Sequence, residues 1–261
     1  MSKNINIIPL NDDINKLQAF IPSLDSDWRE SQRIKSKPIM IETLDTVKYF
    51  QNEGWKISGA YEQRSKNRKI DSHFVRMEHP DFNIKNNKGK VDAVATMNIR
   101  NSCNGKQPLK ADLGLFRQVC SNGLWAHTSY SNATINHSSD GYNELYSLLG
   151  QLNIHTQSIL DEFNSLKQRN LSSSEMMNLA IKAAELRFNN KREARQYAEQ
   201  LLTVVRDEDK GDDIYTVLNR IQENLTQPNR IINENGIWLD GVNDINSDAR
   251  INQELFELVT V

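Results

Sequence analysis

Val91-Asp-Ala-Val-Ala-Thr-Met-Asn-Ile-Arg100 is the stretch that decides the fold. Apolar residues occupy every second position from Val91 to Ile99, and a mostly polar set lies between them. A period of two is that of a β-strand, whose successive side chains point to opposite faces. The stretch therefore predicts a strand over residues 91–100 with at least one buried face.

Three more strands are expected around this one, over Trp55–Glu62, Ser72–Glu78 and Leu109–Val119. In the second of these, His73, Val75 and Met77 should share one face, and Pro80 should end the strand because proline lacks the N–H donor that pairing needs. Asn-Gly pairs within 101–105 and at 122–123 predict turns, since both residues accept positive φ. The second of these turns is expected to end the sheet, so the middle of the chain is predicted to be an antiparallel meander.

Helices are expected on both sides of the meander. Leucines and other apolar residues from Leu145 to Leu166 recur at steps of four and three, which predicts one long helix lying across the sheet or, alternatively, a coiled-coil seam with another subunit. Shorter helices are expected from Thr43 to Gly54, after a capping box at Ser172–Glu175, over Ile214–Leu225 and from Ser247 onward. The fold class is α+β: a basic antiparallel β-meander packed by helices, with a mainly helical C-terminal half.

The domain organisation follows from these patterns. Residues 1–40 have weak periodicity and are expected to form an N-terminal arm. Residues 41–261 are expected to form a single α+β domain, in which 41–130 hold a helix and the meander and 131–261 form the helical half.

Charge is distributed unevenly along a chain whose net charge is only −2. Residues 54–130 hold 13 Lys and Arg against 6 Asp and Glu, a net charge of +7, whereas residues 131–261 have a net charge of −8. A basic segment of this kind is typical of proteins that bind a polyanion. The alternative is that the acidic helices neutralise the basic sheet within the molecule.

The candidate nucleic-acid-binding residues are basic side chains in the strands and loops of the meander: Arg64, Arg68, Lys69, Arg76, Lys88, Lys90, Arg100 and Arg117. The three in or beside strands, Arg76, Arg100 and Arg117, are held most rigidly, and a guanidinium fork fits phosphate oxygens. Their alternative role is structural pairing with nearby carboxylates, namely Asp71, Glu78, Asp92 or Asp112.

Motifs for other chemistries are missing. The two cysteines, Cys103 and Cys120, lack the spacing of a zinc site, and no glycine-rich phosphate loop occurs, so no metal and no cofactor are expected. A nuclease would need converging carboxylates such as Asp92 and Asp112, but no short motif gathers them. We therefore expect a non-enzymatic protein. Without a secretory signal or a membrane-spanning run, we place it in the cytoplasm of a bacterial host.

Several motifs together resemble a known family: Gly54-Trp55, His73-Phe-Val-Arg76, Asn101-Ser-x-x-Gly105 and Phe116-Arg-x-Val-Cys-Ser-Asn-Gly-Leu124. They are similar to the phage/plasmid-like proteins, catalogued as domain of unknown function nine-three-two, and the resemblance extends over about residues 43–258. It implies a gene of phages, plasmids or integrated elements and no particular activity. The order of helix, basic meander and long helix also resembles the core of single-strand annealing recombinases, which form rings and bind DNA backbone in a basic groove.

These observations favour a single-stranded-DNA-binding protein of a phage or mobile element that acts in recombination or replication, including strand annealing, as a homo-oligomer. The alternative is an anti-defence interaction protein that binds and inhibits a host protein. No membrane partner is expected.

The sequence predicts that alanine at Arg76, Arg100 or Arg117 weakens oligonucleotide binding without unfolding the chain. Fluorescence anisotropy with a labelled single strand at low salt, together with thermal melts, measures both properties. Unchanged affinity in all three variants would show that these arginines do not contact DNA.

Overall fold

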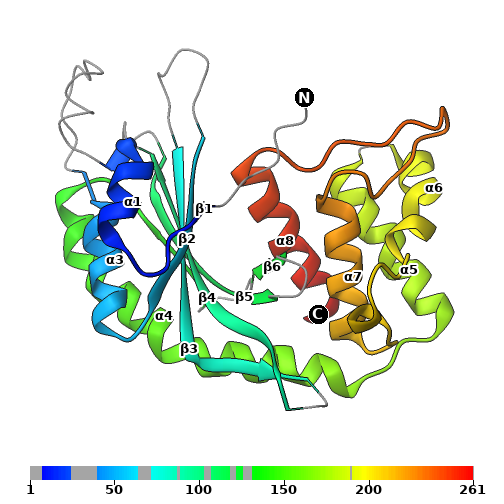
Figure 1. Cartoon of the computed structure of the whole chain (residues 1–261), viewed down its shortest axis with the longest axis horizontal. Coiled ribbons are helices and arrows are strands. Elements are labelled where there is room, and N and C mark those ends of the chain that lie inside the picture. The colour runs from blue at the N-terminus through cyan, green and yellow to red at the C-terminus, as the bar shows by residue number, and fades with distance from the viewer. Residues whose placement is uncertain are drawn as a thin grey trace.

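A computed structural model describes residues 8–24, 40–63, 72–86, 89–102, 107–117, 122–125, 131–188 and 190–260. Within these ranges one antiparallel sheet lies between two layers of helices (Figure 1). Its strands follow the order β1 (Ile8–Pro9), β2 (Lys56–Gln63), β3 (Ser72–Lys85), β4 (Val91–Ser102), β5 (Leu109–Arg117) and β6 (Asn122–Trp125). A further strand, β7 (Asn132–Ile135), also pairs with β5. The predicted α+β class and the meander are confirmed.

Strand β4 lies in the middle of the sheet, where the alternating stretch predicts a strand. Its neighbours β3 and β5 pair with it along almost its whole length, and every residue from Asp92 to Ser102 is buried. Rows of apolar side chains cross the sheet on one face, as in Val75 beside Ile99 and Met77 beside Met97. The opposite face is polar although it is also covered, which the sequence does not predict.

Two predicted strand ends are wrong. Strand β3 continues past Pro80 to Lys85, because the pairing register shifts between His79 and Asn83 and the proline lies within this irregularity. There its missing N–H removes no ladder bond. Asn122-Gly123 does not end the sheet either: both residues belong to β6 and pair with Arg117 and Phe116 of β5.

The apolar face of the sheet is covered by α1 (Ile14–Phe20), α3 (Thr43–Asn52) and the long helix α4 (Ser139–Ser165) (Figure 1). The predicted stripe of α4 is buried at Leu145, Leu149 and Phe163, and the Phe163 ring packs against Phe256 of α8. It is therefore the core-facing side of the helix, and no coiled-coil seam is left on it. Behind α3, the imidazole of the fully buried His73 contacts Ser23 and Thr43 through its two nitrogens at 3.0 and 2.7 Å, which ties residues 8–24 to the sheet.

The second layer consists of α5 (Ser173–Arg187), α6 (Lys191–Leu201), α7 (Ile214–Thr226) and α8 (Ile245–Thr260), as Figure 1 shows. The capping box at Ser172 and Glu175 is present, as predicted. Helix α6 and the N-terminal elements β1 and α1 are elements that the sequence patterns did not predict. No helix among the described residues is long and apolar enough to cross a membrane.

Gly141 in the first turn of α4 lies very close to the backbone that precedes the helix. A Cβ atom there would lie 2.1 Å from the carbonyl oxygen of Asn136 and 2.8 Å from the Ile41 side chain. We therefore expect Gly141→Ala to lower the free energy of unfolding by about 1–3 kcal/mol, the usual cost of overpacking. Gly150→Ala in the same helix is the control, because its Cβ meets only the Tyr49 hydroxyl at 3.3 Å. It should be neutral or stabilising by up to about 1 kcal/mol. Urea titration of both variants measures this, and equal stabilities would contradict the expectation.

Candidate nucleic-acid interface

Arg100 of β4 is buried in an ion pair. Its Nη2 donates to Asp112 Oδ2 of the neighbouring strand β5 at 2.8 Å, and its Nη1 donates to Asn246 Oδ1 of α8 at 3.2 Å. The residue is only 8% exposed. Asp112 in turn accepts a hydrogen bond from Gln253. The structure thus gives Arg100 the structural role that the sequence left open, namely neutralising a carboxylate on the polar sheet face under α8.

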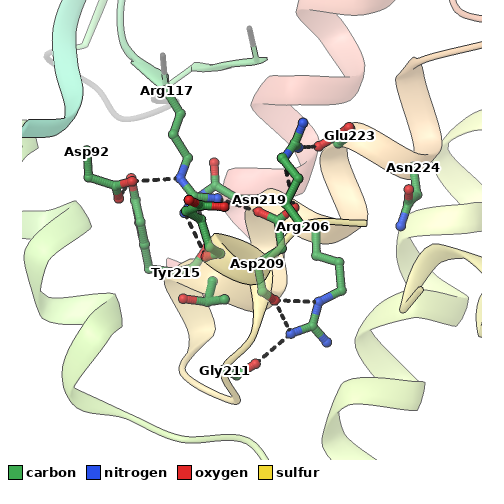
Figure 2. A network of polar contacts seen from close by, with 12 residues as sticks. Asp92, Arg117, Arg206, Asp209, Gly211, Tyr215, Asn219, Glu223 and Asn224 are labelled. Atoms are coloured by element: carbon green, nitrogen blue, oxygen red, sulfur yellow. Dashed lines mark hydrogen bonds and ion pairs between the residues drawn. The ribbon is translucent and has the colours of Figure 1, made fainter. Parts of the chain in front are cut away.

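Arg117 at the end of β5 is more deeply paired, with an exposed fraction of 4% (Figure 2). Its Nε donates to Asp92 Oδ1 at 2.9 Å, its Nη1 to Asp209 Oδ1 at 2.6 Å and its Nη2 to the Glu208 carbonyl at 2.9 Å. Tyr215 donates to the second oxygen of Asp92. All three nitrogens of this guanidinium are therefore engaged inside the protein.

Around this ion pair, further arginines hold the segment between α6 and α7 in place (Figure 2). Arg206 pairs with Asp209 and with Glu223, and Arg230 also pairs with Glu223. Arg220 donates to the carbonyls of Asp209 and Gly211. The predicted neutralisation of basic by acidic segments occurs at Arg117 and Asp209, whereas Arg206, Arg220 and Arg230 are bound by groups of the acidic half itself.

Arg76 of β3 differs from Arg100 and Arg117 in its contacts. Its guanidinium lies over the Phe116 ring with 3.6 Å between the Cζ atom and the ring centroid, and its Nε donates to Ser58 Oγ at 3.1 Å. The nearest carboxylate, Glu78, is 3.5 Å from Nε. Within the described part of the chain, no acceptor lies within hydrogen-bonding distance of Nη1 and Nη2. Four N–H donors of a rigidly held group therefore remain available.

Burial lowers the pKa of Arg76 to about 10, against the opposing effect of Glu78. The side chain is 12% exposed. The pKa is still well above neutrality, so the group carries its full charge at pH 7. A recessed cation that has lost much of its hydration has more to gain from an incoming anion than an exposed lysine has.

The remaining predicted residues fall into two groups. Arg64, Arg68, Lys69 and Lys88 lie outside the described residues. Lys90 is exposed and lines a cavity of about 470 Å³ together with Arg117. The other cations of that cavity, Lys167 and Lys210, were missed because they come from the acidic half of the chain and no local pattern marks them.

The carboxylates considered for a nuclease do not converge. Asp92 is bound by Arg117 and Tyr215, and Asp112 by Arg100 and Gln253. No group of three or more His, Cys, Asp or Glu side chains suited to a metal ion occurs among the residues that the structure describes.

Comparison with protein-family models matches residues 39–255 to the domain of unknown function DUF932. The chain belongs to this family. Two curated Escherichia coli K12 proteins of similar sequence are UPF0380 protein YfjQ, 23% identical over 92% of this chain and 88% of its own length, and UPF0380 protein YafZ, 24% identical over 80% and 75%. The search of solved structures gives no significant match. For this DUF932 protein the likeness to annealing recombinases therefore stays a prediction.

In this DUF932 protein, the ion pairs of Arg117 lead us to expect a loss of stability when it is replaced, and not only a loss of DNA binding. Arg117→Met should lower the free energy of unfolding by about 3–5 kcal/mol, because it leaves the buried Asp92 without a hydrogen-bonded cation and the buried Asp209 with Arg206 as its remaining one. Denaturant melts measure the loss. Arg169→Ala is the control, since its ion pair with Glu175 is 65% and 46% exposed and should contribute little to stability. A loss at Arg117 as small as that at Arg169 would contradict the structural role.

Proposed function

We propose that this protein binds single-stranded DNA through its phosphate backbone and acts in the recombination or replication of a phage or other mobile element. The observation that supports the proposal best is the guanidinium of Arg76. Arg76 is one of the three strand arginines that the sequence selects, and it alone of the three keeps both terminal nitrogens without a described acceptor. The other two are engaged by carboxylates.

The surroundings of Arg76 suit a phosphate. The Phe116 ring below and the Ser58 hydroxyl beside it fix the plane of the fork, so little side-chain entropy is lost when two oxygens bind side by side. Glu78 Oε1 lies 3.5 Å from Nε, and no hydrogen bond from a described residue occupies the two terminal nitrogens.

The recessed position of Arg76 favours a flexible ligand. A side chain that is 12% exposed contacts only groups that can bend toward it. The backbone of a single strand can do so, whereas the phosphates of a duplex are fixed on a wide cylinder. Contacts of this kind leave the bases free to pair, as strand annealing requires, and a basic segment of net charge +7 would add long-range attraction.

A second candidate is the binding of a host protein, and the outer side of α4 favours it. Tyr146 and Ile154, two helical turns apart, are 53% and 75% exposed, and the Tyr49 ring packs against Tyr146 with 5.7 Å between centroids. Capture of one host protein by a chain that binds no oligonucleotide would favour this function over DNA binding.

Two substitutions at Arg76 separate its charge from its shape. Arg76→Ala should weaken binding of a labelled single strand by about tenfold or more, the value of one charge-assisted contact. Arg76→Lys should recover only part of the loss, because an ammonium cannot bind two oxygens side by side. Anisotropy titrations at several salt concentrations should also show affinity falling steeply with salt, with a shallower slope for Arg76→Ala.

The matched control is Arg195→Ala, an exposed arginine on α6 in the acidic half. This substitution should change the affinity for the single strand by less than about twofold, because Arg195 is not expected to contact the DNA. Thermal melts check that the Arg76 variants are folded. If wild-type protein binds no single strand at low salt, or if Arg76→Ala binds as wild type does, the proposed function is wrong.

A further inference from the structure

The cavity beside Arg117 is a second place where cationic side chains of the protein gather. Its volume is about 470 Å³, within the range of small-molecule sites. Its wall comes from the ends of β3, β4 and β5, from Lys167 after α4, and from residues 207–216 including the first turn of α7. Four cationic side chains and four acidic residues line it.

Most of the acidic groups are already bound. Asp92 accepts from Arg117 and Tyr215. Asp207 pairs with Lys210 at 2.6 Å. Asp213 caps helix α7, where its Oδ1 accepts from the Thr216 N–H at 2.9 Å. The fourth acidic residue, Glu208, is exposed and gives its carbonyl to Arg117.

The ammonium groups of Lys90 and Lys167 are less occupied. Lys167 Nζ donates to the Lys85 carbonyl at 3.1 Å and lies 4.6 Å from the centre of the Tyr215 ring, while Asp92 Oδ2 is 3.9 Å away, beyond hydrogen-bonding distance. For Lys90, no side-chain partner occurs among the described residues. The cationic donors of the cavity with unused hydrogen-bonding capacity are therefore Lys90 and Lys167.

We propose that this cavity binds a phosphate monoester, with Lys90 and Lys167 as the two residues that hold it. A monoester at neutral pH carries close to two negative charges and three acceptor oxygens, which matches two ammonium groups. The volume leaves room for a nucleoside attached to the phosphate. The same chemistry occurs in a free nucleotide and in the 5′-phosphate end of a DNA strand.

The state of Lys167 supports this assignment. Burial lowers the pKa of Lys167, and the charges of Asp92 and Asp213 only partly compensate for it. A half-buried ammonium whose pKa is lowered in this way lacks interactions that water would supply, and an anion in the cavity would supply them.

Calorimetric titration of the full-length protein with inorganic phosphate, a nucleoside monophosphate and the matching nucleoside tests the proposal. We expect phosphate and the monophosphate to bind and the nucleoside not to bind. Lys90→Gln and Lys167→Met should each weaken binding by about tenfold, and Lys167→Arg should restore most of the affinity. The control is Lys182→Ala on the exposed side of α5, which should bind as wild type does.

A paired comparison of oligonucleotides with a 5′-phosphate and a 5′-hydroxyl group identifies the source of the monoester. Tighter binding of the phosphorylated strand, lost in Lys167→Met, assigns the cavity to DNA ends. Binding of the monophosphate without this difference assigns it to a free nucleotide. The proposal is overturned if no phosphate-bearing ligand binds at millimolar concentration. It is also overturned if Lys90→Gln and the Lys167 variants are folded and bind phosphate as the wild type does.

This experiment is independent of the proposed function. Binding of the 5′-hydroxyl strand depends on Arg76, whereas the phosphate-dependent part depends on Lys90 and Lys167. Strand binding through Arg76 can be absent while the cavity binds phosphate, and the reverse can also be observed.

Discussion

The pairing of Arg117 with Asp92 and Asp209 is the interaction on which the rest of the structure depends. It joins strands β4 and β5 to the segment that leads into α7. Buried charges are tolerated only when each has its partner, and removing Arg117 would leave Asp92 without a hydrogen-bonded cation and Asp209 with Arg206 as its remaining one. The basic sheet and the acidic helical half are therefore bound together by specific pairs, and the whole described chain packs around one main core.

This pairing also determines which cations are left to meet a ligand. Arg100 and Arg117 are neutralised within the molecule, and Arg206, Arg220 and Arg230 contact carboxylates or carbonyls of the helical half. Arg76 keeps two terminal nitrogens without acceptors among the described residues, and Lys90 and Lys167 line a cavity at the edge of this network. The two proposals follow from this difference: the phosphate backbone of a strand at Arg76, and a phosphate monoester at the two lysines.

Much of the fold could be predicted because its signals are local. Strand β4 follows from alternation, the buried stripe of α4 from steps of three and four, and the start of α5 from a capping box. The predictions of strand ends were wrong where the neighbouring strand, and not the local sequence, determines the secondary structure. Pro80 remains inside β3 because the register shifts around it, and Asn122-Gly123 is strand because β5 offers it a free edge. Helix α6 was missed although its buried residues Ala194, Tyr197, Ala198 and Leu201 recur at helical spacing, because most of its residues are charged or polar.

The sequence by itself determined the fold class, the main helices and strands, and the list of strand arginines, because periodicity and residue type act over short distances. Only the tertiary structure decided which of those arginines is paired. Arg76, Arg100 and Arg117 look alike in sequence, but two of them face carboxylates from other strands or from the helical half, and one lies over a phenylalanine ring. Charge pairing depends on distances of a few ångströms between residues far apart in the chain, and folding alone sets those distances.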